Sequence, residues 1–264
     1  MRHTFHLAVC LALSGILIGQ DAAITSARAE YKSLKAAYDS AMGTYRGSIR
    51  KVYASPAYKE ARSAKDSDAM RKLRAAVPPP DRKAWAAKFA DAAKSYAPAA
   101  GEVPFLGWLA LWSNDKGLAT KSVEAILTRH PDSPDLQEVA EYVGVLRRAT
   151  GDELHAKVMD MLLASKHPLI KANALYSKGY QMVASRNEPS PEDLAKGNEM
   201  LAECAQLAVG TELALRARAP AFEKSRLQIG MPVPDIVGED LDGVPFKLSD
   251  YRGKVVVIDF WGDW

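Results

Sequence analysis

Thiol chemistry is the first possibility to test, and the chain offers two residues for it, Cys10 and Cys204. A redox disulfide or a zinc site needs cysteines at close spacing, as in Cys-x-x-Cys, and these two lie far apart in the sequence. Cys204 falls beside Leu201 and Ala205 on an apolar helical pattern, which indicates a thiol used for packing. The cysteines therefore predict neither a redox pair nor a metal site.

Histidines and the common catalytic motifs predict no other site. His130 and His167 each precede a proline at a predicted helix boundary, His155 stands alone on a predicted helix, and the other two histidines lie near the N-terminus. The sequence contains no Gly-rich phosphate loop after a strand, no H-E-x-x-H and no G-x-S-x-G. No cofactor and no metal is predicted.

The composition is that of a globular protein. With 264 residues, 48% hydrophobic and 25% charged, the chain can bury the core of one large or two small domains. Its 35 basic and 32 acidic residues give a formal charge of +3 without a run of five or six like charges. Basic and aromatic residues are not grouped as a stacking surface requires, so we predict no nucleic-acid partner.

The first 29 residues are predicted to be a signal peptide. Arg2 and His3 form a short basic region, an apolar stretch runs over residues 5–18, and Ala27-Arg28-Ala29 offers a cleavage site. We therefore expect export to the periplasm or cell envelope. An uncleaved membrane anchor is the alternative, although about 14 apolar residues are few for a span that needs about 20. Lipid attachment at Cys10 is not expected, because this cysteine precedes most of the apolar stretch.

Residues 30–226 are predicted to be α-helical, since Ala, Leu, Lys and Glu predominate and apolar residues recur every three or four positions. Pro104 is expected to begin a helix that is apolar all round and therefore buried. Residues 172–182 and 194–207 resemble a tetratricopeptide-type helical pair in which small residues allow close approach, although the full repeat consensus is absent. We predict an irregular helical array, either a peptide- or protein-binding surface or a purely structural domain.

After Arg226 the composition changes, and residues 227–264 are predicted to begin a β-containing domain. Prolines and β-branched residues fill 229–236, and Asp242-Gly243 is typical of a hairpin turn. Residues 244–248 are expected to form the return strand and residues 249–253 a helical turn or loop. Residues 254–260 hold the run Val-Val-Val-Ile, which is typical of a buried, central parallel strand.

This segment resembles the TlpA-type thiol-disulfide oxidoreductases and redoxins, a branch of the thioredoxin-like superfamily related to the AhpC/TSA peroxidases. The matching features, in order, are Ile229-Gly230 followed by Pro234-Asp235, the Asp242-Gly243 turn, the block Lys247 to Lys254, and the strand that leads to Phe-Trp-Gly-Asp-Trp at residues 260–264. The resemblance covers about 36 of the 264 residues. It implies an α/β thioredoxin-like fold of which this segment is the first hairpin and strand.

The resemblance also implies the roles of two residues and the class of partner. Asp259 occupies the place of a buried acid that exchanges a proton with the second redox cysteine, the alternative being an aspartate with no role. Trp264 corresponds to the tryptophan immediately before the family's Cys-x-x-Cys. Expected partners are protein thiols or disulfides and a redox donor protein. Because the cysteine pair itself is absent, this chain is expected to lack dithiol activity, and the helical region to fold alone.

The position of the last residue suggests two hypotheses. Either the reading frame continues through an in-frame UGA that encodes selenocysteine, or the sequence is an ordinary truncation. Two other functions also stay open. A redoxin-type peroxidase is disfavoured because its cysteine normally sits in a Pro-x-x-x-Thr/Ser-x-x-Cys loop, whereas residues 260–264 favour the Cys-x-x-Cys branch. A helical-repeat binding protein with a vestigial redox tail is the non-enzymatic alternative.

Overall fold

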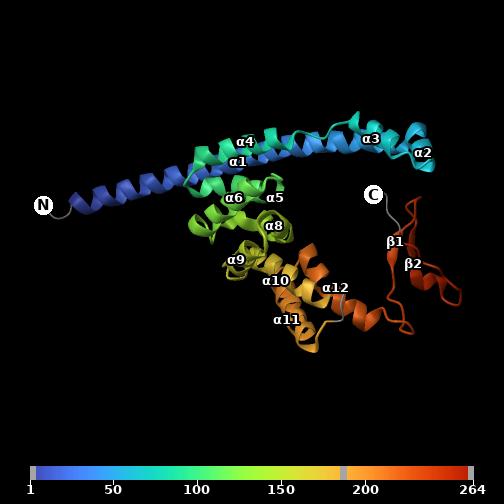
Figure 1. Ribbon diagram of the computed structural model, residues 1–264. Coiled ribbons are helices and arrows are strands. Elements are labelled where there is room, and N and C mark those ends of the chain that lie inside the picture. Colours follow the sequence, from blue (N-terminus) through green and yellow to red (C-terminus); the bar gives the residue numbers. More distant parts are fainter. Residues whose placement is uncertain (1–3, 185–188, 261–264) are drawn as a thin grey trace. The chain divides into compact units, whose positions relative to one another are not determined.

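The computed structural model of the protein describes residues 4–184 and 189–260 and, in the first helix, side chains from Asp21 onward. The chain divides into two compact units, residues 1–178 and residues 179–264. Helices make up the regular structure up to Arg226, and a small hairpin follows them (Figure 1). A helical region followed by the start of a β part is what the sequence predicts.

The first unit is helical throughout the residues that the structure describes. In chain order its α-helices are α1 (Thr4–Ala54), α2 (Pro56–Ser63), α3 (Ser67–Ala75), α4 (Arg82–Tyr96), α5 (Val103–Trp112), α6 (Lys116–Arg129), α7 (Gln137–Glu141), α8 (Val143–Thr150) and α9 (Asp152–Leu163). Short 3-10 helices cover Ala100–Glu102 and Pro134–Leu136. Helix α10 (Pro168–Val183) extends from the first unit into the second.

Local side chains set the helix boundaries. Asp81 begins α4 by accepting hydrogen bonds from the backbone N–H groups of Lys83 and Ala84, at 2.9 and 3.2 Å. Asp115 begins α6 in the same way, with the N–H of Leu118 at 2.9 Å. These carboxylates satisfy N–H groups that the first helical turn leaves unpaired. Gly151 separates α8 from α9 with a φ of 87°, a backbone conformation that glycine adopts without strain.

Helix α5 is the centre of the first unit's core. Its residues from Val103 to Leu111 are all buried, as the uninterrupted apolar sequence predicts. Phe89 of α4 stacks on Trp108 of α5 with ring centroids 3.8 Å apart, and Tyr31 of α1 meets Phe105 edge-on at 5.6 Å. Burying a side chain of this size contributes about 1.5–3 kcal/mol. These contacts hold α1, α4 and α5 together.

Helix α1 continues without a break through the predicted signal-peptide cleavage site. Ala27 is fully buried in the core, and its β-carbon lies against Gly101, where a side chain on the glycine would come within 2.9 Å. Arg28 forms an ion pair with Asp135 through its Nε and Nη2 atoms, at 2.8 and 3.1 Å from the two carboxylate oxygens. Cleavage after Ala29, which stays a prediction, would remove both contacts. In the described part of the chain, no helix is apolar over a length sufficient to span a bilayer.

The second unit begins with the end of α10 and contains α11 (Pro191–Leu207) and α12 (Glu212–Arg226). Glycines allow α10 and α11 to approach closely, because a β-carbon on Gly179 would lie 2.9 Å from the carbonyl oxygen of Gly197. The helical pair predicted from small residues at 172–182 and 194–207 is therefore confirmed. Cys204 is fully buried and its neighbours Leu201 and Ala205 are also buried, so the prediction of a packing thiol is confirmed.

The predicted hairpin is present. Strands β1 (Val237–Glu239) and β2 (Pro245–Lys247) pair antiparallel, with Gly238 opposite Phe246. The turn between them is held by Asp240, whose side chain accepts hydrogen bonds from the N–H groups of Asp242 and Val244, each at 2.9 Å. Gly243 supplies the left-handed residue of the turn with a φ of 78°. A 3-10 helix over Leu248–Tyr251 follows, where a helical turn or loop was expected.

The prediction of a buried strand at residues 254–260 is wrong for this structure. Residues 255–260 have no regular secondary structure, and Val255 and Val257 are 98% and 91% exposed. A central parallel strand is stabilised by a neighbour on each edge and by helices on both faces. The described residues provide β1 and β2, which pair only with each other. Residues 255–258 therefore have no partner strand among the described residues and stay exposed to solvent.

Candidate functional site

The candidate site is the segment that carries the family resemblance, residues 227–264. One aspartate holds its hairpin in place. The Asp235 carboxylate accepts a hydrogen bond from the backbone N–H of Ser249 and another from its hydroxyl, both at 2.8 Å. These two donors to the charged form lower the pKa of Asp235 below its ordinary value. The backbone continues the link, since the N–H of Leu248 donates to the carbonyl of Ile236 at 2.9 Å. The residues before β1 are thus tied to the turn after β2.

The same segment lines an open cavity of about 390 Å³. Its apolar lining comes from Val233, Leu248, Tyr251, Val256 and Ile258. Asp235, Ser249, Arg252 and Lys254 contribute polar groups. Val256 and Ile258 are about half as exposed as Val255 and Val257, so alternate side chains of the run 255–258 face the hairpin. This alternation of more and less exposed side chains is the pattern of a strand, although the described residues provide no partner strand for it.

Of the two residues that the resemblance assigned to redox chemistry, the structure describes only Asp259. Asp259 is exposed and lies in the stretch without regular structure. Its buried position in a complete domain therefore stays a prediction. Trp264 lies outside the described residues. No cysteine occurs in residues 227–264, so the segment itself holds no nucleophilic sulfur.

Cys204 is unsuited to thiol exchange where it lies. Its side chain is fully buried, and burial raises its pKa to about 11. The thiolate is the nucleophilic form, so a thiol with this pKa is almost entirely inert near neutral pH. The structure does not describe the side chain of Cys10. Among the described residues, no group of three or more His, Cys, Asp or Glu side chains is arranged to hold a metal ion.

Part of the chain resembles thiol-disulfide oxidoreductases. Over 42 residues it is 48% identical to the thiol-disulfide oxidoreductase ResA of Geobacillus thermodenitrificans, 50% identical to ResA of Geobacillus kaustophilus and 43% identical to ResA of Bacillus anthracis. Each match covers 16% of this chain and 24% of the relative, so the chain spans about a quarter of the length of these curated relatives. No protein-family model matches the chain. No solved structure matches it either.

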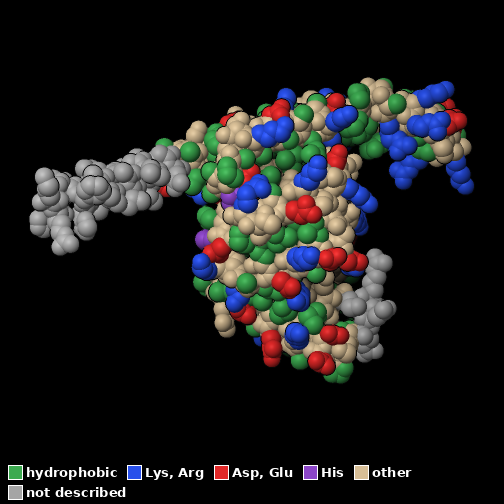
Figure 2. All heavy atoms as spheres, turned by 60° about the vertical axis from the view of Figure 1, so that its left-hand side comes forward, with side chains coloured by type: hydrophobic (Ala, Val, Ile, Leu, Met, Phe, Trp, Pro, Cys, Tyr) green, Lys and Arg blue, Asp and Glu red, His purple; other side chains and the backbone are tan. Residues whose placement is uncertain are grey.

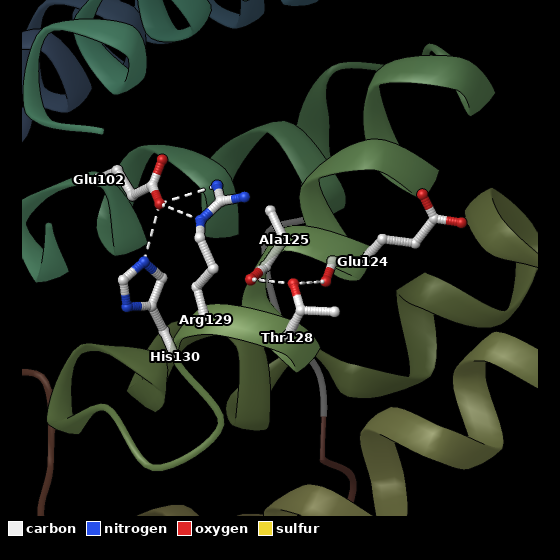
Figure 3. A network of polar contacts seen from close by, with 6 residues as sticks. All are labelled: Glu102, Glu124, Ala125, Thr128, Arg129 and His130. Carbon is white, nitrogen blue, oxygen red and sulfur yellow. Dashed lines mark hydrogen bonds and ion pairs between the residues drawn. The ribbon is translucent and has the colours of Figure 1, made fainter. Parts of the chain in front are cut away.

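The helical unit contains a buried polar cluster that residue spacing did not reveal. The Glu102 side chain is only 2% exposed, and one of its oxygens accepts from Arg129 Nε at 2.8 Å (Figure 3). The same oxygen lies 2.8 Å from His130 Nε2. Both partners come from the C-terminal end of α6, so the cluster fastens that end to the start of α5. The three side chains satisfy one another's hydrogen-bonding groups, as expected of a cluster that stabilises the fold.

A second unpredicted cluster surrounds Glu138. Its carboxylate accepts hydrogen bonds from the hydroxyl of Tyr31 and, at 3.2 Å, from Nε1 of Trp112. Lys35 Nζ lies 3.9 Å from the same carboxylate. Burial, together with the hydrogen bond to Glu138, raises the pKa of Tyr31 strongly. Tyr31 and Glu138 are 107 positions apart, so only the packing of α1 on α7 brings them together.

Proposed function

We propose that the chain is part of an exported thiol-disulfide oxidoreductase of the thioredoxin-like, TlpA type, in which residues 227–264 begin the redox domain and residues 30–226 form a helical accessory region. The similarity to proteins named thiol-disulfide oxidoreductase carries this proposal. The partners would be protein thiols or disulfides and a redox donor protein, and the location would be the periplasm or cell envelope.

The ordered hairpin supports the proposal from the structural side. Asp235 and Ser249, both in the residues that carry the family resemblance, are joined by two hydrogen bonds that fix the register of the segment. The two-faced apolar run that follows fits a strand which a complete domain would cover on both sides. In such a domain, Asp259 would lie on that strand and act as the proton-exchanging acid, and Trp264 would precede the redox pair.

We further propose that this chain alone has no dithiol activity. Disulfide exchange requires a thiolate that attacks and a second thiol that resolves the mixed disulfide. The chain has two cysteines in all, and Cys204 is buried with a pKa of about 11. No pair within the chain can perform the two steps.

Two measurements test the proposal. The nucleotide sequence after the Trp264 codon is read first, to establish whether an open or UGA-interrupted frame encodes a Cys-x-x-Cys-like continuation. The chain and any longer protein are then assayed for insulin reduction by dithiothreitol. We expect turnover from the longer protein and only the uncatalysed rate from this chain. Turnover by this chain would refute the inactivity proposal.

The assays also separate the competing functions. Peroxide consumption by the longer protein without insulin reduction would favour a redoxin-type peroxidase. A frame that encodes no redox cysteine would overturn the oxidoreductase proposal and favour a helical-repeat binding protein.

A further inference from the structure

The end of α1, together with α2 and α3, carries a formal positive charge larger than that of the whole protein. Residues 46–74, here named the basic arm, contain nine lysines and arginines against three acidic residues, a formal charge of +6. The whole chain carries +3, so all the other residues together sum to −3. All nine cationic side chains are exposed. Figure 2 shows Lys and Arg gathered over this end of the first unit.

Most of these charges are not neutralised by the residues that the structure describes. Asp68 pairs with Arg71 at 2.6 Å, and Asp66 is occupied as the cap of α3, accepting from the N–H groups of Asp68 and Ala69. The other eight cations have no ion-pair partner among the residues that the structure describes; they are Arg46, Arg50, Lys51, Lys59, Arg62, Lys65, Lys72 and Arg74. The arm therefore projects a positive potential to its surroundings.

The arm has a defined structure that presents these charges together. Ser55 ends α1 and begins α2, its hydroxyl accepting from the N–H of Tyr58 at 3.2 Å. Tyr53 and Tyr58 pack against each other across this turn with ring centroids 5.0 Å apart. Ala61 of α2 is buried. The end of α1, α2 and α3 thus form one structured end of the first unit on which the lysines and arginines are exposed.

We infer that the basic arm docks on a membrane surface rich in anionic lipids. An end covered with exposed cations is attracted to an anionic surface, and clusters of four to eight Lys or Arg residues are the usual signal for anionic lipid. Tyrosines at the tip, such as Tyr53 at 45% exposure, suit the headgroup region, where an apolar ring and a polar hydroxyl are both accommodated. A nucleic-acid site would instead present a cationic groove with aromatic faces free to stack, whereas Tyr53 and Tyr58 pack on each other with their ring planes tilted by 60°.

Vesicle binding by the full chain tests the inference. Sedimentation is compared for vesicles of phosphatidylcholine and for vesicles that contain about one third phosphatidylglycerol. The difference in binding between the two kinds of vesicle measures the electrostatic contribution, because any binding by the apolar N-terminal stretch is common to both. We expect binding to the anionic vesicles to exceed binding to the neutral ones, and the excess to vanish when salt rises from about 50 mM to about 500 mM.

A matched pair of variants assigns the effect to the arm. The arm variant changes Lys51, Lys59 and Lys72 to Gln. The control variant changes Lys121, Arg148 and Lys224, which are exposed elsewhere in the chain, to Gln. The arm variant is expected to partition about a hundredfold less into anionic vesicles, and the control to stay close to the unmodified chain. Circular dichroism confirms that both variants stay helical.

Three outcomes would overturn the inference. Equal losses in the two triple variants would mean that total charge, and not the arm, drives binding. An arm variant that binds anionic vesicles as tightly as the unmodified chain would exclude the arm as the binding surface. Salt-sensitive binding of the arm to duplex DNA, or to an acidic protein, without any preference for anionic vesicles would assign the surface to another class of polyanion.

Discussion

The carbonyl oxygen of Gly197 lies 2.9 Å from the point where a β-carbon on Gly179 would sit. The relationship is reciprocal, because a β-carbon on Gly197 would lie 3.0 Å from the carbonyl oxygen of Gly179 and 2.8 Å from Val183 Cγ1. At these two glycines α10 and α11 touch through backbone atoms, which cannot move aside as a flexible side chain can. The small residues are therefore a steric requirement of the helical pair.

Alanine at Gly179 is expected to destabilise the protein. In an open helix, Gly→Ala stabilises by about 0.5–1 kcal/mol, because glycine loses more backbone freedom on folding. At Gly179 the added methyl group meets backbone, and we expect a net loss of about 1–3 kcal/mol in the free energy of unfolding. Gly47→Ala in α1 is the matched control, since nothing lies within 4 Å of its β-carbon position. Urea unfolding should shift in opposite directions for the two variants; a stabilised Gly179→Ala would contradict the close approach.

The helices were predictable because their signals are local. The Asp at position 115, Gly151 and the prolines that begin α10 and α11 each mark a boundary within a few residues of the chain. The hairpin was predictable for the same reason, because Asp240 and Gly243, which stabilise its turn, are themselves turn residues. Capping and turn chemistry need no tertiary information.

Features that depend on distant partners were not predictable in the same way. The run 255–258 has the composition of a central strand, yet strand formation needs neighbours that the described residues do not provide. The pairing of Tyr31 with Glu138 depends on how α1 packs, and neither residue belongs to a motif. The basic arm is not evident from the sequence, because its cations are spread over three helices and a turn and form no run of five like charges. These cations come close together only because the three helices lie at the same end of the first unit.

The contacts of Ala27 and Arg28 in α1 give a prediction about processing. A protein that begins at Glu30 loses the buried Ala27 and the ion pair from Arg28 to Asp135. One that begins at Asp21 keeps both. We expect the shorter protein to be less stable by about 1–2 kcal/mol, from the lost apolar burial and a partly exposed ion pair. For a unit of this size that lowers the melting temperature by roughly 2–8 °C. Identical melting temperatures would show that neither contact contributes.

Cys204 is predicted to be chemically silent in the folded protein. With a pKa of about 11, only about one thiol in a thousand is ionised at pH 8. We expect iodoacetamide to label Cys204 very slowly in buffer and rapidly in urea, as measured by peptide mass spectrometry. Rapid labelling of the folded protein would contradict its burial.

The same thiol should make stability depend on pH in the alkaline range. The pKa is raised from 9.0 in the free thiol to about 11 by burial, so the folded state holds the proton more tightly. The stabilising effect is complete below about pH 9 and is lost as the pH rises through about 11. Cys204→Ala removes this group, so its stability should fall less between pH 9 and pH 11 than that of the unmodified chain. Parallel curves for the two proteins would contradict the assignment.

Glu138 is predicted to stabilise the junction of α1, α5 and α7. Replacing it with Ala leaves the partly buried Tyr31 hydroxyl and Trp112 Nε1–H without their acceptor, and we expect a loss of about 1–3 kcal/mol in total, because a fully buried unpaired donor alone costs about that much. The pKa of Tyr31 should fall toward its ordinary value but stay above it, because burial, the largest cause of the increase, persists. Thermal unfolding and the alkaline titration of Tyr31 by NMR measure the two effects. Glu141→Ala, an exposed neighbour on the same helix, serves as the control; equal effects from both changes would rule out a specific role for Glu138.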